Sequence, residues 1–365
     1  MDSLYTYLVC VRCFTFNQHA YIEDAMNGFC MQKTDFPFVC IIVDDASTDG
    51  ESEVIKRYFQ TYFDLQETEE TDDYVLNTGK HKTNGNCYFV VLYLKYNHKS
   101  IEKDKFAYFS KWHDNCKYLA LCEGDDYWID ENKLQKQVDF LEKNDDYSMV
   151  CCKTKLFSTT NKRFIHDNAC YKKSQKMRVR DIIEKGGLYI STCSLVYRSS
   201  VLEAYPEYCK KCLVGDYPLQ IMCAMKGNCY YLNIPMAVYR VDNQNSWMGN
   251  QRDIGLSPNR ENVVVSEIRM MQGFINDFSC YKQYFLNGIQ NLLIKNTPRV
   301  SNYNRYKDYV KSFSYFVKTF NDEIEKFDIM SKIKLLKKST IMYYIWKKNR
   351  SVVVSIIKRV KGEKK

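Results

Sequence analysis

The chain has 365 residues, of which 45% are hydrophobic and 27% charged. This composition predicts a globular protein with one large core or two smaller ones and excludes a disordered chain. We find neither an apolar stretch of the roughly 18–20 residues that span a bilayer nor the pattern of a signal peptide, so we expect a cytoplasmic protein. The net charge is +9, and residues 330–365 alone carry +11, which leaves about −2 for the first 329 residues.

The first part of the chain alternates strand and helix signals. Residues 5–11 and 38–43 are apolar runs typical of buried strands. Residues 22–29 and 54–59 place apolar side chains at helical spacing. This order predicts right-handed crossovers and a parallel sheet.

The next part carries further strand and helix signals. We expect residues 66–86 to form a polar surface insertion, residues 88–94 and 118–122 to form strands, and helices to begin near Ser100 and Asp130. Further strand-like runs lie at 148–152, 193–197, 230–232 and 237–241, with a short helix after Asp216. From Pro258 the pattern is helical, since proline suits a first helical turn. We therefore predict a domain at 1–255 and a helical region at 256–365.

Sixteen cysteines occur, and without a secretion signal we expect them to be reduced, small apolar residues. Two Cys-x-x-Cys pairs, Cys10/Cys13 and Cys209/Cys212, raise the alternative of a four-thiolate zinc site. Cys10 lies inside an apolar strand run, where its side chain should face the core, and this disfavours zinc.

Three carboxylates within four residues follow the run 118–122: Glu123, Asp125 and Asp126. Such a cluster repels itself unless a positive charge lies in it. A buried strand in an open α/β sheet binds ligands at its C-terminal end. Mg²⁺ and Mn²⁺ prefer oxygen ligands and often bind through one or two carboxylates and the phosphates of a substrate, which favours a nucleotide diphosphate ligand.

Several segments, in order, resemble the family 2 glycosyltransferases with the GT-A fold, over roughly the first 250 residues. The matching segments are Thr15-Phe16-Asn17, then Val43 to Asp49 with Ala46 in place of the family's glycine, then Glu123 to Asp126 as a form of the Asp-x-Asp motif, and finally Gly215-Asp216 and Tyr239-Arg240-Val241. The resemblance implies a Rossmann-like, mostly parallel sheet flanked by helices, with a helical C-terminal extension. It also implies an inverting, hexosyltransferase-type enzyme of bacterial polysaccharide biosynthesis.

The resemblance implies that the acid cluster binds a metal ion, Mn²⁺ or Mg²⁺. Asp125 is the first choice of ligand and Asp126 the second, and Glu123 would lie nearer the ribose. The structural alternative for these acids is capping of the helix near Asp130. Asp44 or Asp45 would bind the base, and a carboxylate can accept from N3–H of uracil, so we favour a UDP-sugar donor.

The remaining roles concern the donor pocket and the acceptor. The resemblance implies that Thr15 and Asn17 line the nucleotide pocket, where a plain turn role is an equal alternative. Asp216 is the expected general base for an acceptor hydroxyl of a glycan or lipid-linked glycan, with helix N-capping as its alternative. Arg240 would approach the diphosphate, or else form a surface salt bridge.

The basic segment 330–365 interleaves lysines with large aliphatic residues and Trp346. This pattern favours peripheral binding to the anionic inner face of the cell membrane. A nucleic-acid arm and a helix packed on the catalytic domain are the alternatives, and we expect no nucleic acid partner.

Two other function classes remain open. A sugar nucleotidyltransferase would share the sheet and the metal acids, but it should have a Gly-rich loop after the first strand, and residues 13–17 contain no glycine. A non-catalytic scaffold of the same fold is suggested by Gly215, which stands where the family often has Glu.

Overall fold

The computed structural model describes residues 6–242 and 258–296. The chain divides into two compact units, one formed by Met1–Lys210 and Val214–Asn250, the other by Lys211–Leu213 and Gln251–Lys365. The expected boundary near residue 255 stays a prediction. The basic segment 330–365 lies outside the described residues.

The first unit contains a 12-stranded sheet with the order β10-β12-β8-β11-β6-β1-β2-β5-β4-β3, in which β7 pairs with β12 and β9 pairs with β8. The strands are β1 (Val9–Thr15), β2 (Phe38–Asp44), β3 (Phe63–Glu70), β4 (Tyr74–His81), β5 (Cys87–Leu94), β6 (Tyr118–Leu121), β7 (Tyr127–Trp128), β8 (Tyr147–Ser158), β9 (Arg163–Asn168), β10 (Gln175–Lys176), β11 (Val196–Arg198) and β12 (Asn228–Val241). Strands β6, β1, β2 and β5 run parallel, as predicted. Their carboxyl ends therefore lie at one edge of the sheet.

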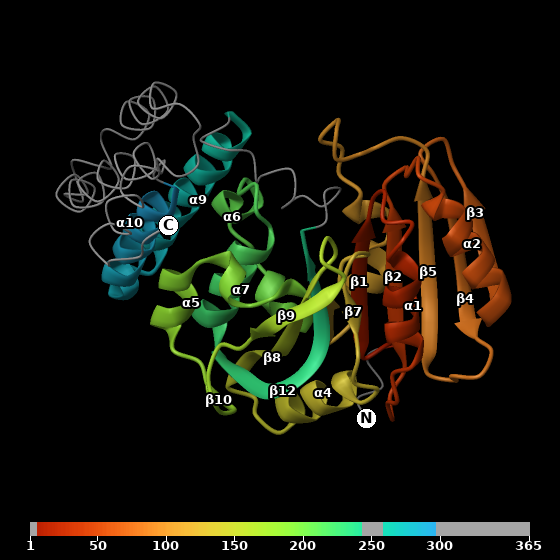
Figure 1. The fold of residues 1–365 in the computed structure, drawn as a ribbon, viewed down its shortest axis with the longest axis horizontal. Coiled ribbons are helices and arrows are strands. Elements are labelled where there is room, and N and C mark those ends of the chain that lie inside the picture. The colour runs from red at the N-terminus through yellow and green to blue at the C-terminus, as the bar shows by residue number, and fades with distance from the viewer. Residues whose placement is uncertain (1–5, 243–257, 297–365) are drawn as a thin grey trace, which may run out of the picture. The chain divides into compact units, whose positions relative to one another are not determined.

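Helices of this unit are α1 (Ile22–Cys30), α2 (Glu51–Tyr62), α3 (Ser110–His113), α4 (Lys133–Glu142), α5 (Val179–Lys185), α6 (Glu207–Lys210) and α7 (Asp216–Lys226), with short 3₁₀ turns η1 (Phe106–Tyr108), η2 (Gly187–Tyr189), η3 (Thr192–Ser194) and η4 (Ser199–Leu202). Figure 1 shows α1 and α2 on one face of the sheet beside β1, β2 and β5. Apolar side chains of α1, α2 and α4 form the main core with this face of the strands. Because β2 is buried at every position, its sequence is a continuous apolar run.

Three local predictions differ from the structure. The expected insertion at residues 66–86 is instead the hairpin of β3 and β4, which extends the sheet beyond β5. The helix expected from Ser100 is mostly loop, with only η1 and the four-residue α3. The first strand also ends later than expected, at Thr15.

The second unit contains α9 (Pro258–Asp277), the turn η5 (Ser279–Tyr281) and α10 (Lys282–Asn296). The rings of Phe274 and Phe285 stack between the two helices with centroids 5.4 Å apart. The described residues contain no helix that is long and apolar enough to cross a membrane.

Candidate active site

Three loops meet where the parallel strands end. The last residue of β1, Thr15, lies opposite Asp44, the last residue of β2. The main chain continues this pairing beyond the strands, because the amide of Asp45 donates to Thr15 O at 3.0 Å and the amide of Gly124 donates to Phe14 O at 3.1 Å. The predicted nucleotide residues and the acid cluster therefore lie at one edge of the sheet.

Gly124 explains how the acid cluster is held against β1. A Cβ atom at this position would lie 2.1 Å from Thr15 Oγ1 and 2.6 Å from Thr15 Cβ, well inside van der Waals contact. The loop between Glu123 and Asp125 therefore packs its backbone directly on the Thr15 side chain, and only glycine fits.

Glu51 is a buried acid at this edge that the sequence reasoning missed. Its carboxylate accepts from Thr15 Oγ1, from the Gln18 amide at 2.8 Å and from Ser47 Oγ at 2.8 Å. Burial raises the pKa of Glu51, and these donors oppose that rise. Glu51 thus ties the end of β1 to the start of α2. In the sequence, Glu51 stands three residues after Thr48, which is the Ser/Thr-x-x-Glu pattern of helix starts and the signal that could have revealed it.

Asp44 and Asp45 are both buried at the predicted position. Asp44 accepts from the Ser47 amide at 2.9 Å. Asp45 accepts from the His98 amide at 2.7 Å and from Lys105 Nζ at 3.1 Å, in an ion pair that is itself largely buried. Both carboxylates thus have donors from the chain, and Lys105 is a cation of this edge that the sequence reasoning missed.

Asn17 has the turn role that was its alternative. Its backbone is left-handed, with φ 55°, its amide donates to Ser47 Oγ at 2.9 Å, and its Oδ1 accepts from the Thr48 amide at 2.8 Å. Ala46, at the family's glycine position, is also left-handed, with φ 61°. These two strained positions shape the loops beside Asp44.

Burial is the main influence on the pKa values of the acid cluster. Burial raises the pKa of Glu123 to about 7, although the nearby Arg12 guanidinium lowers it. Burial, followed by the charge of Asp125, raises the pKa of Asp126 well above its ordinary value. A cation bound beside Asp125 would relieve both effects.

Oxygen donors of this kind fit Mg²⁺ or Mn²⁺ held by one or two carboxylates and a substrate phosphate. A metal cage made by the protein alone does not fit residues 6–242 and 258–296, because no three His, Cys, Asp or Glu side chains converge there. Asp126 is buried and its Oδ1 accepts from the Arg240 amide at 2.8 Å, whereas Asp125 is only partly buried. Asp125 is therefore the more exposed of these two carboxylates.

Arg240, on β12, holds the acid cluster from the neighbouring strand. Its guanidinium donates to the Asp125 carbonyl at 2.7 Å and to the Asp24 carboxylate, and it lies over the rings of Tyr21 and Tyr127 at 4.8 and 4.5 Å. The side chain is largely buried. It therefore supports the backbone of Asp125 and also forms an ion pair with Asp24, a half-exposed carboxylate.

Asp216 is the first residue of α7. Its Oδ2 accepts from Thr192 Oγ1 at 3.1 Å, while Oδ1 is buried and has no hydrogen-bond partner among the described residues. Burial raises the pKa of Asp216, and the Thr192 hydroxyl opposes this. One carboxylate oxygen of Asp216 is thus buried without a hydrogen-bond donor among the described residues.

Tyr239 lies within electrostatic range of both Asp216 and the acid cluster. Burial raises the pKa of its phenol, and the charges of Asp126, Asp125 and Asp216 raise it further, so all three carboxylates lie within electrostatic range of this side chain. A second link runs through η3, whose Cys193 carbonyl accepts from Trp128 Nε1 at 2.9 Å. The sequence reasoning did not assign Thr192 or Tyr239, because their roles arise only from tertiary contacts.

Comparison with known proteins finds similarity to a glycosyltransferase family over part of the chain. Residues 11–91 match the model of glycosyl transferase family 2. Uncharacterized proteins of Mycobacterium tuberculosis and Mycobacterium bovis are 29% identical over 237 residues, which is 64% of this chain and 58% of theirs. The chain thus spans little more than half the length of these curated relatives.

Solved structures share the fold. S. aureus TarS 1–349 in complex with UDP has a TM-score of 0.56 and 15% identity, covering 87% of this chain and 82% of that one. A structure of S. aureus TarS, with a TM-score of 0.53 and 14% identity, covers 87% of this chain and 50% of that one. These structural matches show that the chain has the GT-A fold, and within it residues 11–91 are similar to glycosyl transferase family 2.

Proposed function

We propose that the protein is an inverting glycosyltransferase that moves a sugar from a nucleotide-diphosphate sugar to a hydroxyl of a glycan or lipid-linked acceptor. The observation that carries this proposal is that Asp125, Asp126 and Asp216 all lie within electrostatic range of Tyr239. Transfer needs carboxylates that hold a metal ion beside the donor diphosphate, the role of Asp125 and Asp126. It also needs a carboxylate that takes the proton of the acceptor hydroxyl on the other side of the breaking bond, the role of Asp216. The TarS structure in complex with UDP supports a UDP-sugar as the donor.

Donor binding would use the loops that Glu51 and Gly124 hold together. The segment from Asp44 to Ser47 and the loop of Asn17 would line the nucleotide pocket, with Thr15 beneath them. Lys105, which neutralises Asp45, and Arg12, which faces Glu123, would set the charge that the nucleotide meets. Asp125 would hold Mn²⁺ or Mg²⁺ with Asp126 behind it, and the bound ion would neutralise the leaving diphosphate.

Transfer would proceed by attack of the acceptor oxygen on the anomeric carbon as the bond from that carbon to the diphosphate oxygen breaks. The proton of the acceptor hydroxyl would pass to Oδ1 of Asp216, which has no other partner among the described residues. Thr192 orients this carboxylate through Oδ2. Attack from the face opposite the leaving group inverts the anomeric configuration.

A radiolabelled donor assay tests this proposal. Full-length protein is incubated with UDP-, GDP- or TDP-sugars and Mn²⁺, and released sugar and transferred sugar are measured separately. We expect turnover with one donor class, and a loss of about 10²–10⁴-fold in Asp216→Asn. Synthesis of a nucleotide sugar from a sugar phosphate would support a nucleotidyltransferase, and binding of the donor without turnover would support a scaffold.

Residues 330–365, which lie outside the described residues, would bring the enzyme to a lipid-linked acceptor at an anionic membrane. Co-sedimentation with anionic liposomes, comparing the full chain with a chain ending at Asp328, tests this role. Equal binding of the two chains would remove it.

A further inference from the structure

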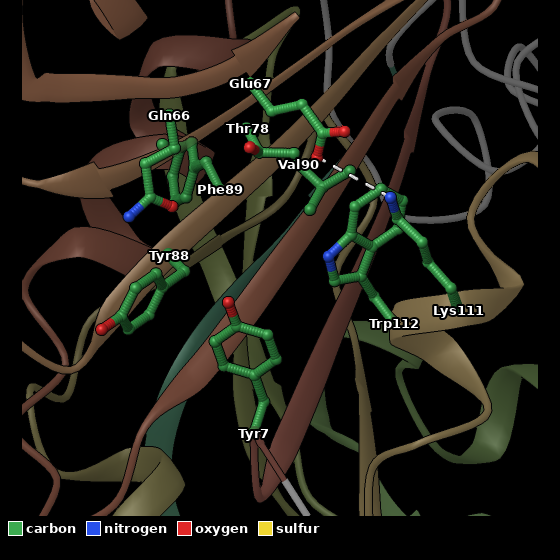
Figure 2. Close-up of a pocket in the computed structure, with 10 residues that line it drawn as sticks. Tyr7, Gln66, Glu67, Thr78, Tyr88, Phe89, Val90, Lys111 and Trp112 are labelled. Carbon is green, nitrogen blue, oxygen red and sulfur yellow. Dashed lines mark ion pairs between the residues drawn. The ribbon is translucent and has the colours of Figure 1, made fainter. Parts of the chain in front are cut away.

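A pocket with a volume of about 400 Å³ is lined by none of the residues of the site described above. Figure 2 shows the side chains of Tyr7, Tyr88 and Trp112 around it, with Val90 between them. Tyr7 precedes β1, Tyr88 is near the start of β5, and Trp112 belongs to α3. The volume is within the usual range of small-molecule sites.

The position of this pocket separates it from the catalytic edge. Tyr88 pairs with Val39 near the start of β2, and Asp44, which ends β2, pairs with Tyr93. At a rise of about 3.3 Å per residue, Tyr88 lies roughly 16 Å from the catalytic edge along the strands, and Val90, the lining residue of β5 nearest that edge, lies roughly 10 Å from it. A ligand in this pocket therefore does not touch the residues proposed to bind the donor.

Aromatic rings form one part of the pocket lining. The rings of Tyr7 and Tyr88 lie 5.0 Å apart at 59°, so they form two tilted walls rather than a closed stack. All three aromatic residues are only partly buried. Flat rings with polar tips suit a ligand that has an apolar face and a polar rim.

Polar groups make up the other half. The Glu67 carboxylate and the Lys111 ammonium lie 3.7 Å apart, and Figure 2 marks this ion pair at the border of the pocket. Both side chains are more than half exposed, so the pair is weak and a ligand can open it. Gln66 and Thr78 add an amide and a hydroxyl to the lining.

The charge of the lining selects the ligand class. Among the lining residues the one carboxylate and the one ammonium balance in charge, and one further ammonium, that of Lys80, lies outside the lining at 5.4 Å from the centre of the Tyr88 ring. Its amide, hydroxyl, carboxylate and ammonium groups both donate and accept hydrogen bonds, which matches a ligand with many hydroxyl groups. Aromatic walls with such a rim fit a neutral saccharide better than an apolar lipid chain.

We propose that this pocket binds a neutral sugar residue of the acceptor glycan, apart from the site of transfer. The identity of the glycan as acceptor rests on the proposed function, whereas saccharide binding itself rests on the pocket alone. Two contacts with one polymer would raise the local concentration of the acceptor end at the catalytic edge.

An array of neutral oligosaccharides, comprising glucans, galactans, mannans and N-acetylglucosamine oligomers, probed with the full-length protein tests this proposal. We expect binding of at least one class, followed by calorimetry in which Trp112→Ala and Glu67→Ala each weaken its affinity at least tenfold. Tyr62→Ala, which removes an aromatic side chain 44% exposed on α2 outside the pocket, is the matched control and should bind as the unmodified protein does.

Two results would overturn the proposal: no neutral oligosaccharide binds at millimolar concentration, or the bound one keeps its affinity in both variants. Glu67 lies on an exposed strand, so its variant decides if Trp112→Ala does not fold. Sugar transfer is measured separately on the same proteins. Glycan binding without transfer would contradict the proposed function alone, and transfer without glycan binding in the pocket would contradict the pocket proposal alone.

Discussion

Substitution of Gly124 by alanine should break the contact that holds the acid cluster on β1. The added Cβ would lie 2.1 Å from Thr15 Oγ1, so either the loop or the threonine must move. Overpacking of this kind costs about 1–3 kcal/mol. If Thr15 turns away, the buried Glu51 carboxylate also loses a donor, which adds about 1–3 kcal/mol.

Urea unfolding of the full chain measures this effect, and we expect a loss of about 2–6 kcal/mol for Gly124→Ala. Gly85→Ala is the matched control, because an added Cβ there has no atom within 4 Å. Adding Thr15→Gly to Gly124→Ala removes both colliding atoms and should restore part of the loss. Equal unfolding midpoints for Gly124→Ala and Gly85→Ala would refute the reasoning.

Three further predictions follow from the same geometry. Ala46→Gly should raise the free energy of unfolding by about 0.5–1 kcal/mol. Ala46 has φ 61°, and glycine would relieve about 1–2 kcal/mol of backbone strain, which exceeds the entropy that glycine adds to the unfolded chain. An unchanged urea midpoint would contradict this. Arg240→Met should lower stability by about 2–4 kcal/mol and weaken donor binding in calorimetry, since it removes the donors to the Asp125 carbonyl and to Asp24; a variant with normal donor affinity would show that Asp125 does not need this support. The turnover rate should fall as pH decreases through the raised pKa of Asp216, which is above the ordinary aspartate value of about 3.9, because protonation removes the base. The same fall in rate at low pH in Asp216→Asn would assign the titration to another group.

Much of the parallel sheet could be predicted because its strands are buried on both faces. β2 and β5 read as continuous apolar runs, and the acids that follow β2 and β6 mark their carboxyl ends. The hairpin of β3 and β4 was missed because β3 is exposed along nearly its whole length. An exposed edge strand carries charged residues that resist aggregation, and such a sequence looks like a loop.

The position of the candidate site could be predicted from the same pattern, but its internal contacts could not. Asp44 and Asp125 come after apolar runs that read as strands, and Asp216 precedes a run that reads as a helix. Glu51 and Thr192 act by hydrogen bonds to residues 36 and 24 positions away in the chain, and local sequence does not encode such pairings. Burial likewise sets the pKa of each acid, and it depends on the finished fold.

Measurement of donor turnover by the unmodified chain, Asp125→Asn and Asp216→Asn tests the central claim most directly. Each variant removes one charge with little change in size, and urea unfolding checks that both remain folded. We expect Asp125→Asn to lose affinity for Mn²⁺ and donor, and Asp216→Asn to keep donor affinity while losing about 10²–10⁴-fold in transfer. Full transfer activity in either variant would contradict the account.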